Sequence, residues 1–319
     1  MLPAQSVSHH YIAVLDSLQH LGRHYFMSGQ FEDGLSVLQH GVDLVGATSA
    51  PASYIQLLLT YGHILTWQSS LITGDYVQPM AVLQDAVERA DMLGNAGVQA
   101  RAYDELGFCH YQRAMTSNSD FVDAATHFQQ ALALWERLGD IAGICTARFH
   151  VGLIAERAGQ FDAAVAHFTW VHTTAQNYNL SSQQAEASRH LGFAALRAAD
   201  YNQALAAFQE ALTLTEAAQS QLFLPFAYAS VGEVYHTQHK YIEARQYYER
   251  GAEKAVEFGV RRATVQILYC LGELAEEQQQ RQAAHDYYTE AHQTAQAIHF
   301  QLGVQMTAAK LAQLMATES

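Results

Sequence analysis

Small and apolar residues recur along the chain in a pattern that repeats every 40 or 45 positions. An apolar residue followed by glycine recurs at seven regularly spaced positions, and the glycines of these seven pairs are 40, 45, 45, 40, 40 and 40 positions apart. Self-similarity at this period is typical of arrays in which each repeat packs against its neighbours. The pairs are Leu21-Gly22, Tyr61-Gly62, Leu106-Gly107, Val151-Gly152, Leu191-Gly192, Val231-Gly232 and Leu271-Gly272.

Each repeat is predicted to be a helix–turn–helix unit. Behind the glycine, at offsets of 12, 16 and 19, a small, a large and a small residue recur, as in Ala204, Phe208 and Ala211. Small residues at helical spacing let two helices approach closely, and the large residue fills the gap between them. We expect several second helices to end at a residue that tolerates left-handed backbone. The candidates are Gly94, Gly139, Asn179 and Gly259.

The second and third repeats each carry a five-residue insertion, which accounts for both 45-residue spacings. The first, roughly Gln68–Thr73, is apolar enough to extend a helix. The second, roughly Arg113–Asp120, contains Met115–Asp120, which predicts a loop. Neighbouring insertions would form a lip on one rim of the array. Alternatively, they reflect a duplicated repeat that inherited its loop length.

This pattern resembles the tetratricopeptide repeat (TPR) family in its longer form of about 40 residues, over about residues 12–316. The Leu/Val-Gly, Ala, Phe/Tyr and Ala columns carry the resemblance, although the family's Trp column and terminal proline are missing. That form is similar to the sensor halves of bacterial signal-transduction ATPases and to peptide-responsive regulators. The chain contains neither a P-loop nor a basic DNA-reading helix–turn–helix.

The resemblance implies an all-α fold, a right-handed α-solenoid superhelix of seven helix–turn–helix repeats with a C-terminal capping helix. We expect residues 1–319 to form one array. Its repeats should lie at about 12–47, 52–92, 97–137, 142–177, 182–218, 222–258 and 262–298, and the capping helix at 303–316.

Composition narrows the classes of partner. Seventeen Lys and Arg against 31 Asp and Glu give a formal net charge of −14, so nucleic acid and anionic membranes are disfavoured. The sequence has no apolar run long enough to span a bilayer and no visible secretory signal. Cys109, Cys145 and Cys270 have no CxxC spacing, which disfavours a disulfide framework. We therefore expect a cytoplasmic location.

The resemblance also implies that first helices line a concave inner face. Aromatic and arginine side chains concentrate there in repeats two to five, and both types are typical of binding hot spots. Alternatively, some aromatics belong to the core and some arginines pair with Asp104, Glu105, Glu156 or Glu186. The candidate ligand-binding residues are Trp67, Arg101, Glu105, Phe108, Tyr111, Phe149, His150, Arg157, Arg189, His190, Phe193 and Arg197.

Three of these arginines sharpen the prediction. Arg157, Arg189 and Arg197 come from adjacent repeats, and we expect them to point into one cavity. Such a cavity would attract an anionic or aromatic ligand. If that groove does not bind, the site moves to the acidic C-terminal repeats. The acidic inner residues there are Glu233, Glu273, Glu276 and Glu277, and the cavity partners expected for the arginines are His150, His190 and Phe193.

Three functions remain open from the residues. The first is a non-enzymatic scaffold that captures a peptide or protein segment in its concave groove. The second is a small-molecule receptor or unusual enzyme with a pocket lined by Arg, His and aromatic residues of repeats two to five. The third is a homo-oligomeric scaffold. No catalytic residue or cofactor is predicted, and although Glu105, His150 and His190 share an inner column, no metal site is predicted.

Overall fold

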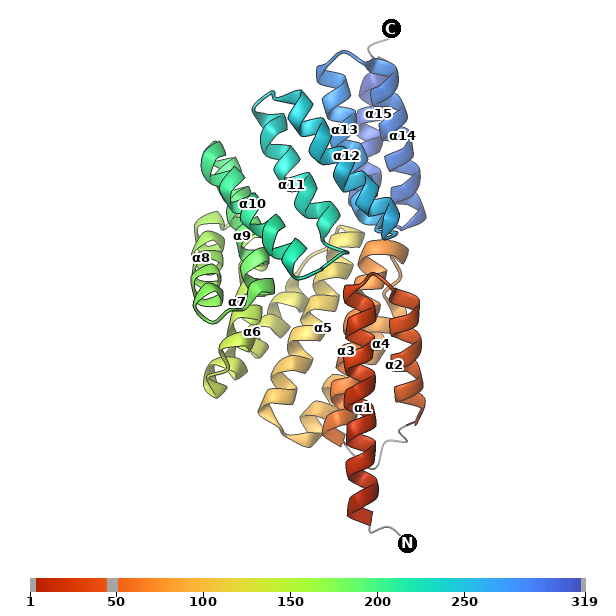
Figure 1. Ribbon diagram of the computed structural model, residues 1–319, viewed down its shortest axis with the longest axis vertical. Helices are drawn as coiled ribbons and strands as arrows, with labels where there is room; N and C mark the ends of the chain where they lie inside the picture. The colour runs from red at the N-terminus through yellow and green to blue at the C-terminus, as the bar shows by residue number, and fades with distance from the viewer. Residues whose placement is uncertain (1–3, 45–50, 317–319) are drawn as a thin grey trace. The chain divides into compact units, whose positions relative to one another are not determined.

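The protein is all-α. A computed structural model describes residues 4–44 and 51–316, which form fifteen α-helices and one π-helical turn and contain no strand (Figure 1). The bounds are α1 Ala4–Met27, α2 Phe31–Leu44, α3 Pro51–Gln68, η1 Ser69–Thr73, α4 Val77–Leu93, α5 Ala96–Ser117, α6 Val122–Leu138, α7 Ile141–Arg157, α8 Phe161–Asn177, α9 Ser181–Arg197, α10 Tyr201–Ala217, α11 Leu224–Thr237, α12 Tyr241–Glu257, α13 Arg261–Glu277, α14 Arg281–Ala297 and α15 Gln301–Ala316.

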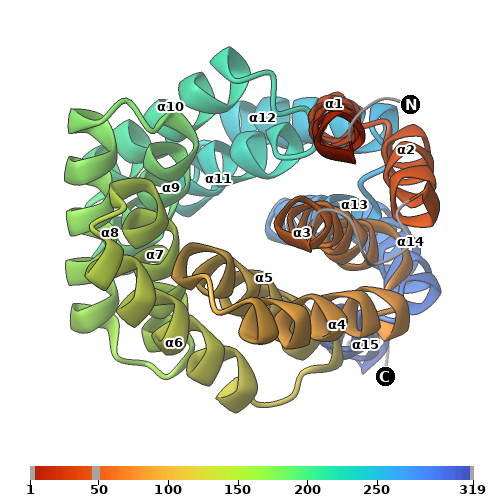
Figure 2. The same cartoon turned by 90° about the horizontal axis from the view of Figure 1, so that it is seen from below.

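Successive helices pair as hairpins, which confirms the predicted helix–turn–helix repeat. Helices α8, α9 and α10 lie side by side in both views (Figures 1 and 2), and α13, α14 and α15 also pack in succession. The first helix begins at residue 4, earlier than the predicted 12, and the capping helix begins at residue 301, earlier than 303. Residues 45–47 of the first predicted repeat lie outside the described residues.

The repeat glycines lie where the two helices of a hairpin touch, as the spacing predicts. A Cβ atom added to Gly192 would lie 2.6 Å from a ring carbon of Phe208. In the next repeat, one added to Gly232 would lie 2.8 Å from Tyr248. These are the residues at offset 16, and they are fully buried. The hairpins are therefore held by a large side chain packed directly against a helix backbone.

Left-handed residues end the helices at the expected positions. The predicted Gly94, Gly139, Asn179 and Gly259 all have positive φ, between 56° and 70°. The sequence did not indicate that residues with side chains also take this conformation at the ends of first helices. Ala199, for example, has φ 57°, where Gly159 in the preceding repeat has φ 74°.

The two insertions are both mainly helical. The first forms the π-helical turn η1, in line with the predicted helix extension. The second was predicted as a loop over Met115–Asp120; this is wrong for Met115–Ser117, which continue α5, and correct for residues 118–120, which form a turn and loop. Asn118, with φ 55°, then ends the helix, and Ser119 donates its backbone N–H to the carbonyl of Ala114. Thr116 and Ser117 of the insertion thus form the last turn of α5.

Contacts divide the described residues into two compact units. Unit 1 comprises residues 4–44, 51–69, 76–113 and 120–154, and unit 2 comprises residues 70–75, 114–119 and 155–316. Most of each insertion, residues 70–73 and 114–119, belongs to unit 2, where both contact the C-terminal helices. Arg262 Nη1 donates to Thr116 Oγ1 at 3.2 Å, and Asn118 donates to Gln305 at 3.4 Å. The single array over residues 1–319 stays a prediction.

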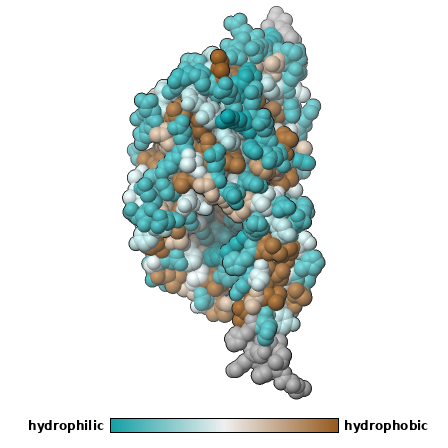
Figure 3. Space-filling view, in the orientation of Figure 1, coloured by the Kyte–Doolittle hydropathy of each residue, from teal (hydrophilic) through white to brown (hydrophobic). Residues whose placement is uncertain are grey.

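Hydrophobic residues are interspersed with hydrophilic ones on the face shown in Figure 3. Within the part of the chain that the structure describes, no helix is both long enough and apolar enough to cross a bilayer.

Candidate functional site

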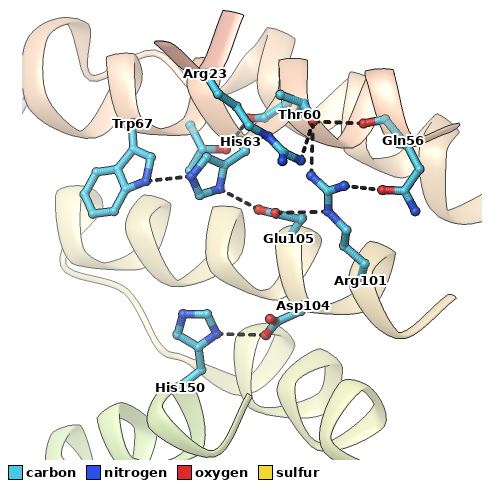
Figure 4. A network of polar contacts seen from close by, with 11 residues as sticks. Arg23, Gln56, Thr60, His63, Trp67, Arg101, Asp104, Glu105 and His150 are labelled. Carbon is cyan, nitrogen blue, oxygen red and sulfur yellow. Dashed lines mark hydrogen bonds and ion pairs between the residues drawn. The ribbon is translucent and has the colours of Figure 1, made fainter. Parts of the chain in front are cut away.

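The inner positions of α3 and α5 in unit 1 form a continuous polar network (Figure 4). Arg101 donates to Thr60 Oγ1 at 3.1 Å and to the Gln56 side-chain oxygen, and its Nε lies 3.8 Å from Glu105 Oε1. Arg23 donates to the same Thr60 oxygen at 3.3 Å. Burial lowers the pKa of Arg101, an effect that Glu105 opposes. Arg101 is therefore engaged inside the protein, as the alternative interpretation of the sequence allowed.

A histidine with a defined proton position continues this network. The indole N–H of Trp67 donates to Nε2 of His63 at 3.2 Å, so that nitrogen accepts and carries no proton. The proton is on Nδ1, which donates to Glu105 Oε2 at 2.7 Å. Burial raises the pKa of Glu105, but His63 and Arg101 outweigh burial and hold that pKa below its usual value. Glu105 is thus an ionised carboxylate with its partners already in place.

Phe108 connects this group to a second histidine. Its ring stacks on His63 with centroids 6.0 Å apart and on His150 with centroids 5.5 Å apart, both at 26° between planes. His150 Nδ1 lies 2.8 Å from Asp104 Oδ1 (Figure 4). Each of these two histidines therefore contacts a carboxylate through one ring nitrogen, and the Phe108 ring packs between the two imidazoles.

Three of the aromatic candidates are core residues. Phe108, Tyr111 and Phe149 are only 6%, 6% and 4% exposed. The Tyr111 ring packs 5.3 Å from that of Phe121 at the start of the next helix. Side chains with so little exposed area can offer a ligand only a small contact surface.

A related group lies in unit 2, on α7 and α9. Arg189 donates to Nε2 of His190 at 3.1 Å, and His190 Nδ1 lies 3.0 Å from Glu156 Oε2. Burial and the adjacent Arg189 lower the pKa of His190 to about 4, so this histidine is neutral at pH 7. The Arg189 guanidinium also lies 5.6 Å from the centroid of the Phe193 ring.

The three arginines expected to share a cavity have different surroundings. Arg189 contacts His190 and Phe193 as predicted. Arg197 is exposed, and its guanidinium lies 4.0 Å from the centroid of the Phe161 ring at the start of α8. Arg157 is exposed at the end of α7. The structure therefore brings together part of the predicted set, around Arg189.

The three residues considered for a metal site each pair with a different side chain, not with one another. Glu105 pairs with His63, His150 with Asp104, and His190 with Glu156. Within residues 4–44 and 51–316, no group of three or more His, Cys, Asp or Glu side chains is arranged to hold a metal ion.

A cavity of about 690 Å³ lies in unit 2, among the inner positions of α11 and α13 and the capping helix α15. Tyr248 of α12 and Met115, in the last turn of α5, complete its wall. It combines apolar surface with ionisable groups, as ligand pockets usually do. Its charged and titratable lining comprises Glu233, His236, His239, Arg262, Tyr269, Cys270, Glu273 and Glu277, and its apolar lining includes Met115, Val265, Phe300 and Met306.

The electrostatics of this cavity differ from those of the inner face in unit 1. Burial, together with the charge of Glu273, raises the pKa of Glu233 to about 7. Glu273 itself lies 3.3 Å from the ammonium of Lys310 on α15. Burial also raises the pKa of the Cys270 thiol, so this cysteine is not an activated nucleophile.

The sequence indicated only half of this cavity. Glu233, Glu273 and Glu277 stand in the inner columns of repeats six and seven, so their acidic character was visible. The contributions of Met306 and Met115 were not, because they come from the capping helix and from an insertion. Met306 on the capping helix is 40% exposed and lines the cavity.

Comparisons with known proteins concern the fold. No family model matches the chain, and no curated protein matches it. A solved structure of NprR in complex with its cognate peptide NprX has a TM-score of 0.63 at 13% identity, covering 97% of this chain and 83% of that one. RapI in its apo form has a TM-score of 0.63 at 10% identity, covering 89% and 98%.

A third similar structure is of a protein that contains a tetratricopeptide repeat sensor. It is a signal-transduction ATPase from Pyrococcus horikoshii with a tetratricopeptide repeat sensor, with a TM-score of 0.55 at 12% identity, covering 94% of this chain and 46% of that one. The fold is that of a TPR array. Its hairpins, its repeat glycines and its capping helix agree with the TPR interpretation of the sequence. At these identities the similarity establishes the TPR fold alone.

Proposed function

We propose that the chain is a non-enzymatic module that binds a peptide or protein segment in the cavity of unit 2. The observation that carries the proposal is that cavity, about 690 Å³ in volume and lined by inner side chains of two successive first helices. Pockets of roughly 300–1,000 Å³ hold drug-sized ligands, a range that also suits a few peptide residues.

The contrast with unit 1 supports this location. There, hydrogen bonds and an ion pair already join the polar side chains of Arg101, Glu105, His63 and Trp67. A ligand would have to break those contacts before it formed its own, and a buried polar group that loses its partner costs about 1–3 kcal/mol. In the unit 2 cavity, aromatic and thioether side chains line the wall, and within the described residues the Glu233 carboxylate makes no hydrogen bond or ion pair that a ligand would have to break.

The fold comparisons support the class of ligand. The solved structure of NprR contains its cognate peptide. A Rap protein complexed with competence and sporulation factor also has this fold, with a TM-score of 0.59 at 12% identity. A cavity on the inner helices of a TPR array is compatible with an extended segment, because such arrays present a continuous concave surface.

The test blocks the cavity with one side chain. Thr237 is exposed, lines the cavity, and donates its hydroxyl to the carbonyl of Glu233 four residues earlier. Thr237→Trp should weaken the binding of selected peptides at least tenfold, since the indole would occupy the entrance. Peptides would be selected from an acetylated hexapeptide library on the full-length chain, and affinities measured by fluorescence anisotropy.

Thr213→Trp on α10 is the matched control. Thr213 is also exposed and also donates to the carbonyl four residues earlier, but it does not line the cavity. Equal affinities for both variants would place peptide binding outside this cavity. Failure of any library member to bind the unmodified chain would contradict the proposed function itself.

A further inference from the structure

We propose that the unit 2 cavity recognises a cationic group, the side chain of a lysine or arginine in the bound segment. This inference rests on the proposed function and names the chemistry of its ligand. The acceptor is the carboxylate of Glu233 on α11, in a cavity whose walls are aromatic and thioether side chains.

Carboxyl groups outnumber cationic side chains in the cavity lining. Three carboxylates line it, those of Glu233, Glu273 and Glu277, against the single guanidinium of Arg262. That guanidinium donates to Thr116 Oγ1 at 3.2 Å, on the wall formed by the second insertion. Once Glu233 is ionised, the lining carries more negative than positive charge, and a ligand cation would reduce that excess.

The three carboxylates differ in their partners. Glu273 lies 3.3 Å from the ammonium of Lys310, and Glu277 lies 3.6 Å from Nδ1 of His239. Glu233 makes no hydrogen bond or ion pair through its carboxylate with any residue in the described parts of the chain. A half-buried carboxylate without a cation is costly once it is ionised, so a ligand cation would form its contact here with little competition.

An independent observation also points to a ligand. Nε2 of His236 is buried, and within the described residues it makes no hydrogen bond. Its contact with Glu277 at 3.4 Å lies outside hydrogen-bonding geometry. Since Nδ1 of the same ring lies 3.3 Å from the Tyr248 hydroxyl, the orientation of the ring is constrained. An unsatisfied buried nitrogen in a cavity wall can bind a polar group of the ligand backbone.

The walls suit the stem and head of a long basic side chain. Two cationic side chains of the protein already lie over aromatic rings of this cavity. The guanidinium of Arg262 lies 4.3 Å from the centroid of Phe300, and the ammonium of Lys310 lies 6.0 Å from that of Tyr269. Lysine and arginine bury their methylene stems against apolar surface while their heads reach a charge or ring. Met115 and Met306 supply adaptable surface for such a stem.

The experiment compares matched peptides on matched variants of the full-length chain. Each arginine or lysine in a library-selected peptide is replaced by glutamine, and both peptides are titrated at low salt. Glu233→Gln removes the proposed acceptor, whereas Glu253→Gln removes an exposed carboxylate of α12 outside the cavity with the same change in net charge. We expect glutamine in the peptide, or at position 233, to weaken binding about tenfold, with no further loss when the two are combined.

A second probe keeps the two proposals separable. Phenethylammonium and the neutral phenethyl alcohol are compared by ligand-observed NMR on the same two variants. Binding of the amine alone, lost only in Glu233→Gln, supports the cation site even if no peptide binds.

Two results would overturn the cation site. One is peptide binding that is unaffected by loss of the basic residue, which leaves the proposed function intact. The other is an amine that binds Glu233→Gln as well as it binds the unmodified chain. Circular dichroism of each variant checks its folding.

Discussion

Single residues at the ends of the first helices show how this repeat tolerates strain. Gly159 and Ala199 occupy the same position in successive repeats and both have positive φ. For a residue with a Cβ atom, left-handed backbone costs roughly 1–2 kcal/mol. The later repeats therefore contain backbone strain that a glycine would remove, because alanine, histidine and glutamine stand there in place of glycine.

Ala199→Gly should stabilise the protein. The gain from relieved strain exceeds the added entropy of the unfolded chain, which offsets roughly 0.4–1 kcal/mol, so we expect a net gain of about 0.5–1 kcal/mol in urea unfolding. The reverse change, Gly159→Ala, is the control, because no heavy atom lies within 4 Å of the added Cβ and the loss is purely conformational. Lower stability in Ala199→Gly would show that the methyl group makes a contact worth more than the strain.

Glu233 should make stability depend on pH. Its pKa rises from 4.5 to about 7 on folding, so the folded state binds more protons between these values and stability falls as pH rises through them. The groups that face it are Glu273 and Cys270 of α13 and Tyr248 of α12. Glu233→Gln removes this loss and should stabilise the protein at pH 8 by on the order of 1–3 kcal/mol.

The measurement is thermal unfolding of both proteins at pH 4 and pH 8. Below pH 4.5 the Glu233 carboxyl is largely protonated in both states, so the two proteins should unfold at similar temperatures there. A gain of equal size at pH 4 would indicate that packing, rather than charge, separates the two side chains.

At the scale of elements, the sequence determines the hairpins well. The glycine at each repeat start and the large residue at offset 16 meet directly, as Gly192 and Phe208 do. Both partners lie within one repeat, so a fixed spacing suffices to predict their contact. The length of α5 was harder to predict, because Thr116 and Ser117 have weak helical preference and it is tertiary contact, as between Thr116 and Arg262, that favours the extra turn.

The candidate site was less predictable for a related reason. The repeat columns predicted which side chains share one side of the first helices, but whether such a side chain is available to a ligand depends on its partner in another repeat. Arg101 and Thr60 are 41 positions apart, and no pattern in a single sequence links them. The pairing of His63 with Glu105 likewise joins two repeats. The sequence indicated acidic side chains at Glu233 and Glu273, but not that the predicted capping helix would line a cavity together with them.

At the scale of the whole molecule, the insertions are structural parts of unit 2. Gly74, directly after η1, packs against the backbone carbonyl of Ile298, the C-cap residue of α14, three residues before the capping helix begins. The second insertion contacts the same region through Asn118 and Gln305. Segments far apart in the sequence therefore hold the helices that form the cavity, which gives the paired insertions a role beyond an inherited loop length.

This arrangement predicts a specific sensitivity at Gly74. Gly74 and Gly94 have similar positive φ, 73° and 70°, but an added Cβ would collide with the Ile298 carbonyl at Gly74 and would meet no atom within 4 Å at Gly94. Alanine at either position therefore introduces the same backbone strain, roughly 1–2 kcal/mol, and only Gly74→Ala adds a clash worth typically 1–3 kcal/mol more. Hydrogen exchange should show faster opening of residues 114–119 and of α15 in Gly74→Ala but not in Gly94→Ala. Equal protection in both variants would mean that the insertion rests on the C-terminal helices without supporting them, and the cavity wall at Met115 would then be independent of η1.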